Sequence, residues 1–214
     1  MEKNLQDYRK SYEKYTLSET VIPVSPIMLF EEWFLEAEKD DKIDEANAMN
    51  ISTIGLDGFP KNRVVLLKKY TEKGFTFYTN YESEKGLAIS KNPQVCLSFF
   101  WPNMERQVII KGVATKTSEE ESSAYFYSRP RGSQLGALAS NQSKRISSRQ
   151  ELEEELEDLT KKYEGETIPK PNEWGGYNVV PVNYEFWQGR KNRLHDRILF
   201  SKVDQKWKIE RLAP

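Results

Sequence analysis

The chain has 214 residues, and its 37% hydrophobic and 12% aromatic content is enough for one generous core, so we expect a single domain over residues 1–214. Its 32 Lys and Arg residues nearly balance 33 Asp and Glu residues, and the formal net charge of -1 gives no global positive field for nucleic acid or an anionic membrane. With one cysteine, neither a disulfide within the chain nor a cysteine-rich metal site is expected.

Two features of the sequence bear on where the chain works. Cys96 lies in the apolar run 95–100, where a small core residue is favoured over a reactive thiol. The start, Met1–Asn4, is charged and no long apolar run follows, so we expect neither a signal peptide nor a membrane-spanning helix. The expectation is a cytoplasmic protein without a metal site.

The first predicted elements are an arm and a helix. Residues 4–15 mix aromatic and charged side chains without a wide apolar stripe, which indicates a marginal helix or a mobile arm, with the arm spanning residues 1–20. Ser25 and Pro26 supply an N-cap and a first-turn proline for the helix that follows. One face of that helix is apolar and is expected to pack on a large surface; its residues are Leu29, Phe30, Trp33, Phe34 and Ala37.

Short strand-like runs dominate the rest of the chain. They cover residues 48–54, 61–70, 75–79, 95–101, 106–115, 177–187, 194–200 and 207–211. Asp57-Gly58 is a hairpin signal between the first two, and the Pro- and Gly-containing stretch 169–176 predicts a loop. Helix starts are indicated at Ser83, Ser118 and Ser148, the last two with capping-box patterns. Together they predict a mainly β fold with peripheral α-helices, an antiparallel barrel that closes on itself.

The single histidine lies in the charged run 188–200, which has the pattern of a strand. Because side chains alternate across a strand, Arg193, His195 and Arg197 would share one face. Basic residues on a solvated edge strand would explain this pattern without any function. The alternative is an anion-binding and proton-transfer site, which needs a pocket wall and a phosphate cradle from elsewhere in the chain.

Three other segments offer phosphate-binding groups. The strand Arg63–Lys68 has an apolar middle with a cation at each end, which suits a planar ring that carries a phosphate, although solvated strand ends have the same pattern. Lys85 at a helix start combines a charge with free backbone N–H groups, although such a lysine is often only solvated. Tyr125 and Arg129 lie four residues apart in the segment Ala124–Ser133, where a surface salt-bridge cluster is the alternative to a phosphate clamp.

Seven short motifs stand out when the chain is taken as a whole. They are Arg63–Lys68, Phe77–Asn80, Tyr125–Ser133, Gln142-Ser143, Phe186–Gly189, Arg193–Arg197 and the terminal Arg211–Pro214. Together, in this order and over nearly the whole chain, they resemble the pyridoxamine 5′-phosphate oxidase family, and the last two motifs are the most specific. The resemblance implies an FMN-binding, antiparallel Greek-key split β-barrel that forms a homodimer, with two flavin sites in the subunit interface.

The resemblance also implies which residues bind cofactor and substrate. One subunit's share of the FMN site would be Arg63, Val64, Val65, Leu66, Leu67, Lys68, Tyr78, Thr79, Ser83, Lys85 and Gln107. The other subunit would add Gln142, Ser143, Trp187 and Arg197. The substrate phosphate would be gripped by Lys68, Tyr125, Arg129 and Ser133. The pyridine ring would face Arg193, Leu194 and His195, with Arg193 and His195 as the catalytic pair. Arg9 and Tyr12 match a family segment that closes over the substrate.

One position departs from the family pattern. Glu84 stands beside Lys85 where the family often has arginine, and a carboxylate cannot donate a hydrogen bond to a phosphate. Either Glu84 turns outward and Arg63 with Lys85 suffices, or FMN binds less tightly than is usual for the family.

The activity that the resemblance implies is FMN-dependent oxidation of pyridoxamine 5′-phosphate and pyridoxine 5′-phosphate to pyridoxal 5′-phosphate, with O2 reduced to hydrogen peroxide, in vitamin B6 metabolism. Two alternatives stay open. One is a non-catalytic carrier of flavin or pyridoxal phosphate on the same barrel, because a fold does not determine a function. The other is a basic-patch binding module without a cofactor.

Overall fold

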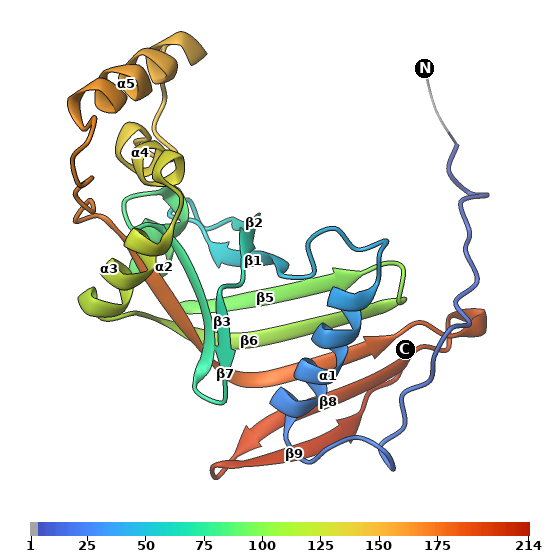
Figure 1. The fold of residues 1–214 in the computed structure, drawn as a ribbon. Helices are drawn as coiled ribbons and strands as arrows, with labels where there is room; N and C mark the ends of the chain where they lie inside the picture. The colour runs from blue at the N-terminus through green and yellow to red at the C-terminus, as the bar shows by residue number, and fades with distance from the viewer. Residues whose placement is uncertain (1–3) are drawn as a thin grey trace. The chain divides into compact units, whose positions relative to one another are not determined.

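The computed structural model of the chain describes residues 4–214, so residues 1–3 of the predicted arm and most of the charged start lie outside the described residues. Within that range nine strands form one sheet in the order β2-β1-β5-β6-β7-β4-β3, and β8 joins β7 to β9 beside this path (Figure 1). The strands are β1 Ala48–Ile54, β2 Pro60–Leu66, β3 Lys69–Thr71, β4 Gly74–Asn80, β5 Gln94–Trp101, β6 Arg106–Lys116, β7 Trp174–Gln188, β8 Asp196–Val203 and β9 Lys206–Arg211.

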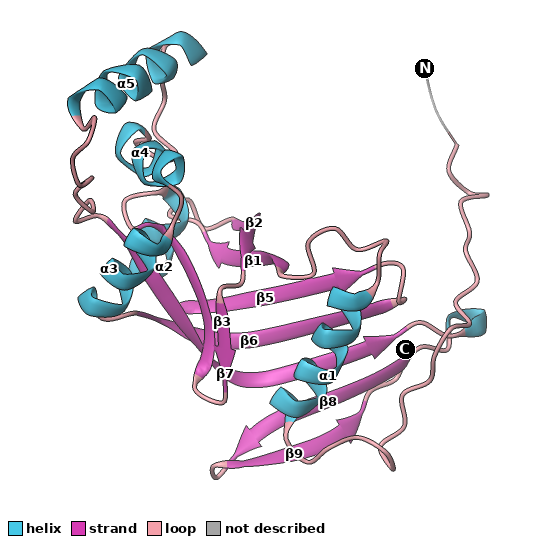
Figure 2. Cartoon of the chain, in the orientation of Figure 1, coloured by secondary structure: helices cyan, strands magenta, loops and turns pink. Residues whose placement is uncertain are grey.

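Five α-helices accompany the sheet in the described residues (Figure 2). They are α1 Pro26–Lys39, α2 Glu84–Lys91, α3 Glu119–Ser128, α4 Arg131–Ala139 and α5 Arg149–Lys162. The three predicted serine caps are confirmed, since Ser83, Ser118 and Ser148 each accept a hydrogen bond from a backbone N–H in the first turn of their helix. Helix α5 buries none of its side chains, as expected for a solvated helix.

Long-range contacts divide the chain into two compact units, although strands β1, β5, β6 and β7 contribute residues to both. The first unit contains Met1–Met49, Leu97–Lys111 and Pro181–Pro214, and the second contains Asn50–Cys96 and Gly112–Val180. The single domain over residues 1–214 therefore stays a prediction. Strand β7 is central to the sheet because its residues Trp174–Val179 pair antiparallel with β4, while Asn183–Gln188 pair antiparallel with β8.

The core of the first unit forms where α1 covers its strands. Phe30 meets the ring of Phe99 edge-on at 5.1 Å between centroids, and Trp33 meets Phe186 in the same way at 5.3 Å. The predicted apolar face of α1 is confirmed, because all five of its residues are buried. Burial of this face, rather than the helix propensity of the segment, stabilises the helix.

The second unit is built on the pairing of β4 with the first half of β7. Gly175 and Gly176 lie in this strand and not in the predicted loop. A Cβ on Gly175 would come within 2.2 Å of the Tyr81 hydroxyl, and one on Gly176 within 2.7 Å of the Thr117 hydroxyl. The two glycines are therefore explained by close packing of neighbouring groups against the strand.

Several other expectations need correction. The run 61–70 is two strands, since β2 ends at Leu66 and β3 begins at Lys69. Residues 4–15 contain a turn but no helix, so the helix alternative for this segment is excluded and the arm alternative is retained. Helix α4 was not predicted. Nor is the barrel closed in residues 4–214, because the hydrogen-bonded path ends at β2 and at β3 without joining them.

The strand predicted from residue 194 begins only at Asp196. Residues Lys191–Arg193 form a single 3-10 turn in which Asn192 and Arg193 have φ values of 56° and 63°. Arg193 and His195 therefore do not alternate along one strand. Two consecutive residues with left-handed backbone angles cannot continue a β ladder.

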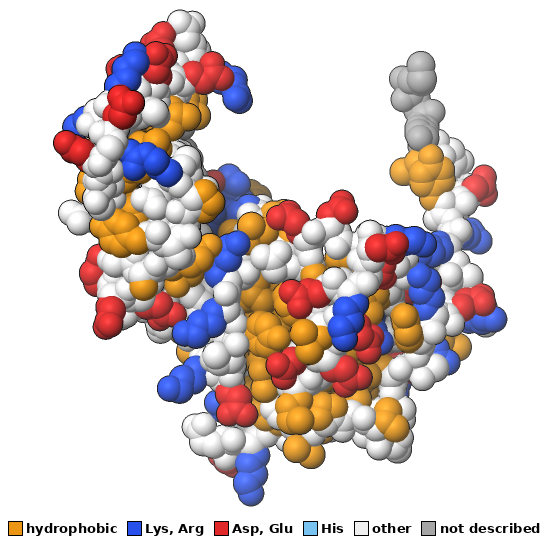
Figure 3. All heavy atoms as spheres, in the orientation of Figure 1, with side chains coloured by type: hydrophobic (Ala, Val, Ile, Leu, Met, Phe, Trp, Pro, Cys, Tyr) orange, Lys and Arg blue, Asp and Glu red, His pale blue; other side chains and the backbone are white. Residues whose placement is uncertain are grey.

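Basic and acidic side chains are interspersed over the face shown in Figure 3, in keeping with the nearly neutral net charge. In residues 4–214 no helix combines the length and the apolar character that crossing a membrane requires.

Candidate active site

A cavity of about 450 Å³ opens in the second unit, and most of the predicted phosphate-binding residues line it. Strand β2, the end of β4, the start of α2, the α3–α4 junction and the start of β7 contribute its walls. The lining residues are Val64, Val65, Leu66, Lys68, Tyr78, Thr79, Lys85, Tyr125, Arg129, Pro130, Ser133, Gln142 and Trp174. Segments that are distant in the sequence thus meet around one space.

Lys85 is a buried cation at this cavity. Its Nζ donates to Thr79 Oγ1 at 3.1 Å and to Gln142 Oε1 at 2.7 Å, and Ser83 Oγ lies 3.3 Å away. None of these neutral partners balances its charge. Burial, and then repulsion by Arg63, lower the pKa of Lys85 to about 8. An anion bound beside Lys85 would offset both effects.

Arg63 has an unused donor in the same unit. Its Nη1 donates to Thr53 Oγ1 at 2.7 Å, whereas its Nη2 is buried and finds no hydrogen-bond partner among the described residues. Burial lowers the pKa of Arg63. A buried donor without a partner is costly, and an acceptor brought by a ligand would satisfy Arg63 Nη2.

Glu84 forms an ion pair with Lys61 of strand β2. Lys61 Nζ lies 2.5 Å from Glu84 Oε2, and the Glu84 side chain is 43% exposed. The first of the two alternatives is therefore favoured, in which the carboxylate is turned to a cation and to solvent. Lys61 neutralises the charge that would otherwise oppose an anion at Lys85.

Three aromatic rings form a stack at the other wall of the cavity. Tyr78 and Tyr125 stack with centroids 3.9 Å apart, and Trp174 lies parallel to both, within 11°. The guanidinium carbon of Arg129 lies 4.7 Å from the centre of the Trp174 ring. Arg129 Nη1 is buried and has no hydrogen-bond partner within residues 4–214, so it is a second donor available to an anion.

Arg131 lies two residues after Arg129, but its side chain does not line the cavity. Its guanidinium donates to the backbone carbonyls of Tyr163 and Glu166, which ties α4 to the segment after α5. Although it belongs to the basic segment noticed in the sequence, it does not line the cavity.

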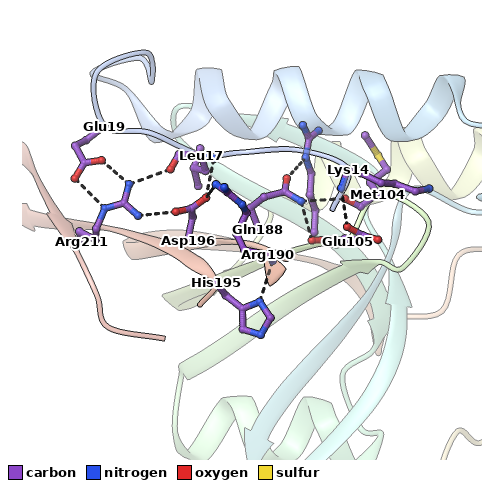
Figure 4. A network of polar contacts seen from close by, with 11 residues as sticks. Lys14, Leu17, Glu19, Met104, Glu105, Gln188, Arg190, His195, Asp196 and Arg211 are labelled. Carbon is purple, nitrogen blue, oxygen red and sulfur yellow. Dashed lines mark hydrogen bonds and ion pairs between the residues drawn. The ribbon is translucent and has the colours of Figure 1, made fainter. Parts of the chain in front are cut away.

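His195 belongs to the first unit and lies among aromatic rings. Its ring centroid is 4.7 Å from that of Trp187 and 5.9 Å from that of Tyr12, whose edge meets Trp187 at 5.7 Å. The backbone N–H of Arg190 donates to His195 Nδ1 at 3.1 Å (Figure 4). Burial and the charge of Arg193 lower the pKa of His195, and Asp196 opposes them. The neutral imidazole with its proton on Nε2 satisfies this hydrogen bond.

Other predicted residues of the first unit have partners of their own. Arg197 Nε donates to Glu185 at 2.8 Å and its Nη1 to the Ala213 carbonyl, and Gln107 donates to Ser98. Arg9 donates to the Gln6 carbonyl and is exposed, as are Arg193 and Leu194.

The remaining expectations concern the second unit. Gln142 was expected from the partner subunit, but it accepts hydrogen bonds from Lys85 and Thr79 of its own chain. Ser143 lines a neighbouring hollow together with Glu84. The Leu67 side chain is 4% exposed and belongs to the core, not to the cavity lining.

Sequence reasoning missed Trp174, Arg190 and Asp196. Trp174 directly precedes Gly175-Gly176. An aromatic residue next to two glycines indicates a segment on which other groups pack closely, so this motif was a usable signal for a residue that lines the cavity. Asp196 accepts from Arg190 and Arg211 and from the backbone N–H of Leu17 (Figure 4). The side chain of Arg211, 15 residues from Asp196, gave no local hint of this network.

Comparison with known families decides the classification. Residues 35–163 match the model of the pyridoxamine 5′-phosphate oxidase family, and residues 174–214 match that of the pyridoxine 5′-phosphate oxidase C-terminal dimerisation region. The chain belongs to the pyridoxamine 5′-phosphate oxidase family. The second match covers β7, β8 and β9, so it assigns the dimerisation region to these strands.

Relatives of this family match over the full length. The pyridoxine/pyridoxamine 5′-phosphate oxidase of Flavobacterium johnsoniae is 62% identical over 98% of this chain and 99% of its own length. The oxidase of the same name from Christiangramia forsetii is 58% identical over the whole of both chains. That of Leptospira biflexa is 50% identical over 99% of each.

Solved structures agree on the fold of the pyridoxamine 5′-phosphate oxidase family. PhzG from Burkholderia lata, solved in complex with tetrahydrophenazine-1-carboxylic acid, has a TM-score of 0.88 at 25% identity, over 96% of this chain and all of its own. A pyridoxamine 5′-phosphate oxidase-related, FMN-binding protein from Nostoc punctiforme has a TM-score of 0.68 at 18% identity, over 90% of this chain and all of its own. The fold is the split barrel of this family.

Proposed function

We propose that this chain is an FMN-dependent oxidase that converts pyridoxamine 5′-phosphate and pyridoxine 5′-phosphate to pyridoxal 5′-phosphate. The observation that carries the proposal is one aromatic-walled cavity lined by three cations, Lys68, Lys85 and Arg129, none of which pairs with a carboxylate in the described residues. Planar, phosphate-bearing molecules suit such a cavity. The full-length similarity to oxidases of these vitamers supports the same substrates.

The residues present fit FMN. Arg63 Nη2 and Lys85 Nζ offer cationic donors for its phosphate, and the Ser83-capped start of α2 adds a favourable helix end. Val64, Val65 and Leu66 of β2 and the following Lys68, with Tyr78 and Thr79, would lie along the ring system, and Gln107 would complete this subunit's share. Bound FMN supplies the hydride acceptor, which O2 then reoxidises with release of hydrogen peroxide.

The reaction balances for both substrates. The amine, with O2 and water, gives pyridoxal 5′-phosphate, ammonia and hydrogen peroxide, and the alcohol with O2 gives pyridoxal 5′-phosphate and hydrogen peroxide. The chain's own task is to orient the substrate. Arg129, with Lys68, Tyr125 and Ser133, would hold the phosphate, while the Nε2–H of neutral His195 and the guanidinium of Arg193 would face the pyridine ring, beside Leu194.

The proposed assembly is a homodimer whose FMN sites lie at the subunit interface. Trp187 and Arg197 pair directly across β7 and β8, in the matched dimerisation region, and would contribute to the partner's flavin site. Gln142 lies beside Lys85 of its own chain, so Gln142 and the adjacent Ser143 would act in the flavin site of their own subunit. Phosphorylated vitamers and FMN carry charges that prevent them from crossing a membrane, so we expect the chain to work in the cytoplasm, where these molecules are retained.

The deciding experiment is a peroxide assay on the purified chain. We expect a yellow preparation with flavin absorbance that releases hydrogen peroxide when pyridoxamine 5′-phosphate is added, and far less with unphosphorylated pyridoxamine. Bound flavin without peroxide would support the non-catalytic carrier instead. Absence of flavin binding after FMN is supplied would contradict both and favour the cofactor-free binding module.

A further inference from the structure

A buried carboxylate holds the arm that precedes α1. Glu105 lies in the turn between β5 and β6, is 2% exposed and has a left-handed φ of 56°. Its Oε2 accepts the backbone N–H group of Glu13 at 2.8 Å and that of Lys14 at 3.1 Å, and Figure 4 shows the contact with Lys14. Two consecutive arm residues are thus fixed by one oxygen that is distant in sequence.

Little else balances this carboxylate. The ammonium of Lys10 lies 3.9 Å from Oε1, but the Lys10 side chain is 61% exposed. Burying a carboxylate is costly unless its hydrogen bonds repay it, and strained backbone adds to the cost. Glu105 is both a buried carboxylate and a residue with a left-handed backbone, and the arm donates two hydrogen bonds to it. This combination points to a role in holding the arm.

The backbone of Glu105 ties the same residue to the end of β7. Its carbonyl accepts the N–H of Gly189 at 2.7 Å and Nε2 of Gln188 at 3.1 Å. Gln188 is fully buried. Glu105 therefore connects the arm to the segment that carries Trp187 and leads to His195.

Tyr12 is the residue that this connection positions. Its ring packs on Gly189 so closely that a Cβ there would lie 2.7 Å from Tyr12 Cγ. The ring also contacts Trp187 and His195, at 5.7 and 5.9 Å between centroids. Further along the arm, Asp196 Oδ2 accepts the N–H of Leu17 at 3.1 Å, so the segment after Tyr12 is fastened at both ends.

We propose that Glu105 is a positioning residue, which holds Tyr12 against His195 and Trp187 by accepting the arm's backbone N–H groups. The fastening rests on the geometry alone. Its consequence for substrate binding rests on the proposed function. With Tyr12 in place, the arm covers the substrate bound at His195. Without Glu105, the substrate dissociates faster.

The fastening is tested by hydrogen exchange on the full chain supplied with FMN. In Glu105→Gln an uncharged acceptor replaces a charged one, and the protection of the Glu13 and Lys14 amides should fall about fivefold; in Glu105→Leu, which has no acceptor, it should fall more than tenfold. The matched control is Glu32→Gln, the same change at an exposed carboxylate on α1. If Glu105→Leu does not fold, Glu105→Gln alone decides.

The consequence is tested by kinetics on the same variants. Glu105→Gln should raise the KM for pyridoxamine 5′-phosphate severalfold with a smaller change in kcat and no loss of bound FMN. Tyr12→Ala should do the same, and the double variant should be no worse than Tyr12→Ala, because Glu105 acts through Tyr12. If the two substitutions raised the KM additively, Glu105 would not act through Tyr12.

The outcomes separate this inference from the proposed function. Unchanged amide protection in a folded Glu105→Gln variant overturns the positioning role, whatever the activity. A wild-type chain that fails to oxidise the phosphorylated vitamers overturns the proposed function, whereas a fall in amide protection on changing Glu105 would still support the fastening.

Discussion

The backbone N–H of Arg190 donates a hydrogen bond to Nδ1 of His195, 3.1 Å away. A protonated imidazole carries hydrogens on both nitrogens, so this contact is lost when His195 gains a proton. Burial and the charge of Arg193 also disfavour that proton. The fold therefore stabilises a neutral His195 whose Nε2–H is available to a substrate.

His195 should titrate below its ordinary pKa of 6.5. The folded state disfavours the protonated form of His195. The stability and activity that depend on neutral His195 should therefore be fully present above pH 6.5, and they should be lost as the pH falls through the lowered pKa. The chain has one histidine, so nitrogen-detected NMR of the imidazole reports it without ambiguity. Arg193→Ala should raise this pKa, and a pKa at or above 6.5 in the wild type would contradict the environment described.

Arg129→Ala should raise the KM for pyridoxamine 5′-phosphate more than it lowers kcat. A charge-assisted phosphate contact contributes about 1.5–3 kcal/mol of uniform binding, which corresponds to a KM increase of roughly 10- to 150-fold. Arg131→Ala is the matched control, since its guanidinium is bound to the carbonyls of Tyr163 and Glu166. Equal effects of the two substitutions would remove Arg129 from the phosphate clamp.

FMN affinity should weaken above pH 8. The pKa of Lys85 is lowered to about 8, so below that pH Lys85 already carries the charge that a phosphate needs. Above it, binding requires uptake of a proton, and the Kd for FMN should rise by up to about tenfold per pH unit. Quenching of flavin fluorescence between pH 7 and 9.5 measures this. Lys85→Arg, which stays charged, should flatten the profile; an equally steep profile in that variant would assign the effect to another group.

Subunits with complementary lesions should restore each other if flavin sites are shared. Arg197→Met and Arg63→Met homodimers should each bind FMN poorly. A mixed dimer would contain one site with both changes and one with neither, so about half of the flavin binding and activity should return. Differently tagged subunits that co-purify establish exchange. Exchange without recovery of flavin would mean that Arg197 does not act in the partner's site.

Local sequence determined much of the framework. The apolar face of α1, the caps at Ser83, Ser118 and Ser148 and the Asp57-Gly58 turn depend on neighbouring residues, and all are observed. A cap needs only the backbone N–H groups two or three residues ahead, so its signal is complete within the motif. The motifs of the family were readable for the same reason, because each is a short run of residues.

Tertiary structure decided which groups are left without partners. The sequence places Arg63, Lys85 and Arg129 in three separate segments, and only folding shows that donors of Arg63 and Arg129 are buried unpaired while Arg131 is satisfied elsewhere. Likewise, Glu105 meets the arm some 90 residues away, and Trp174 lies parallel to Tyr78 and Tyr125. Whether a charged or aromatic side chain is solvated or functional depends on its burial and on its contacts with residues distant in sequence. A local sequence pattern predicts neither the burial nor these contacts.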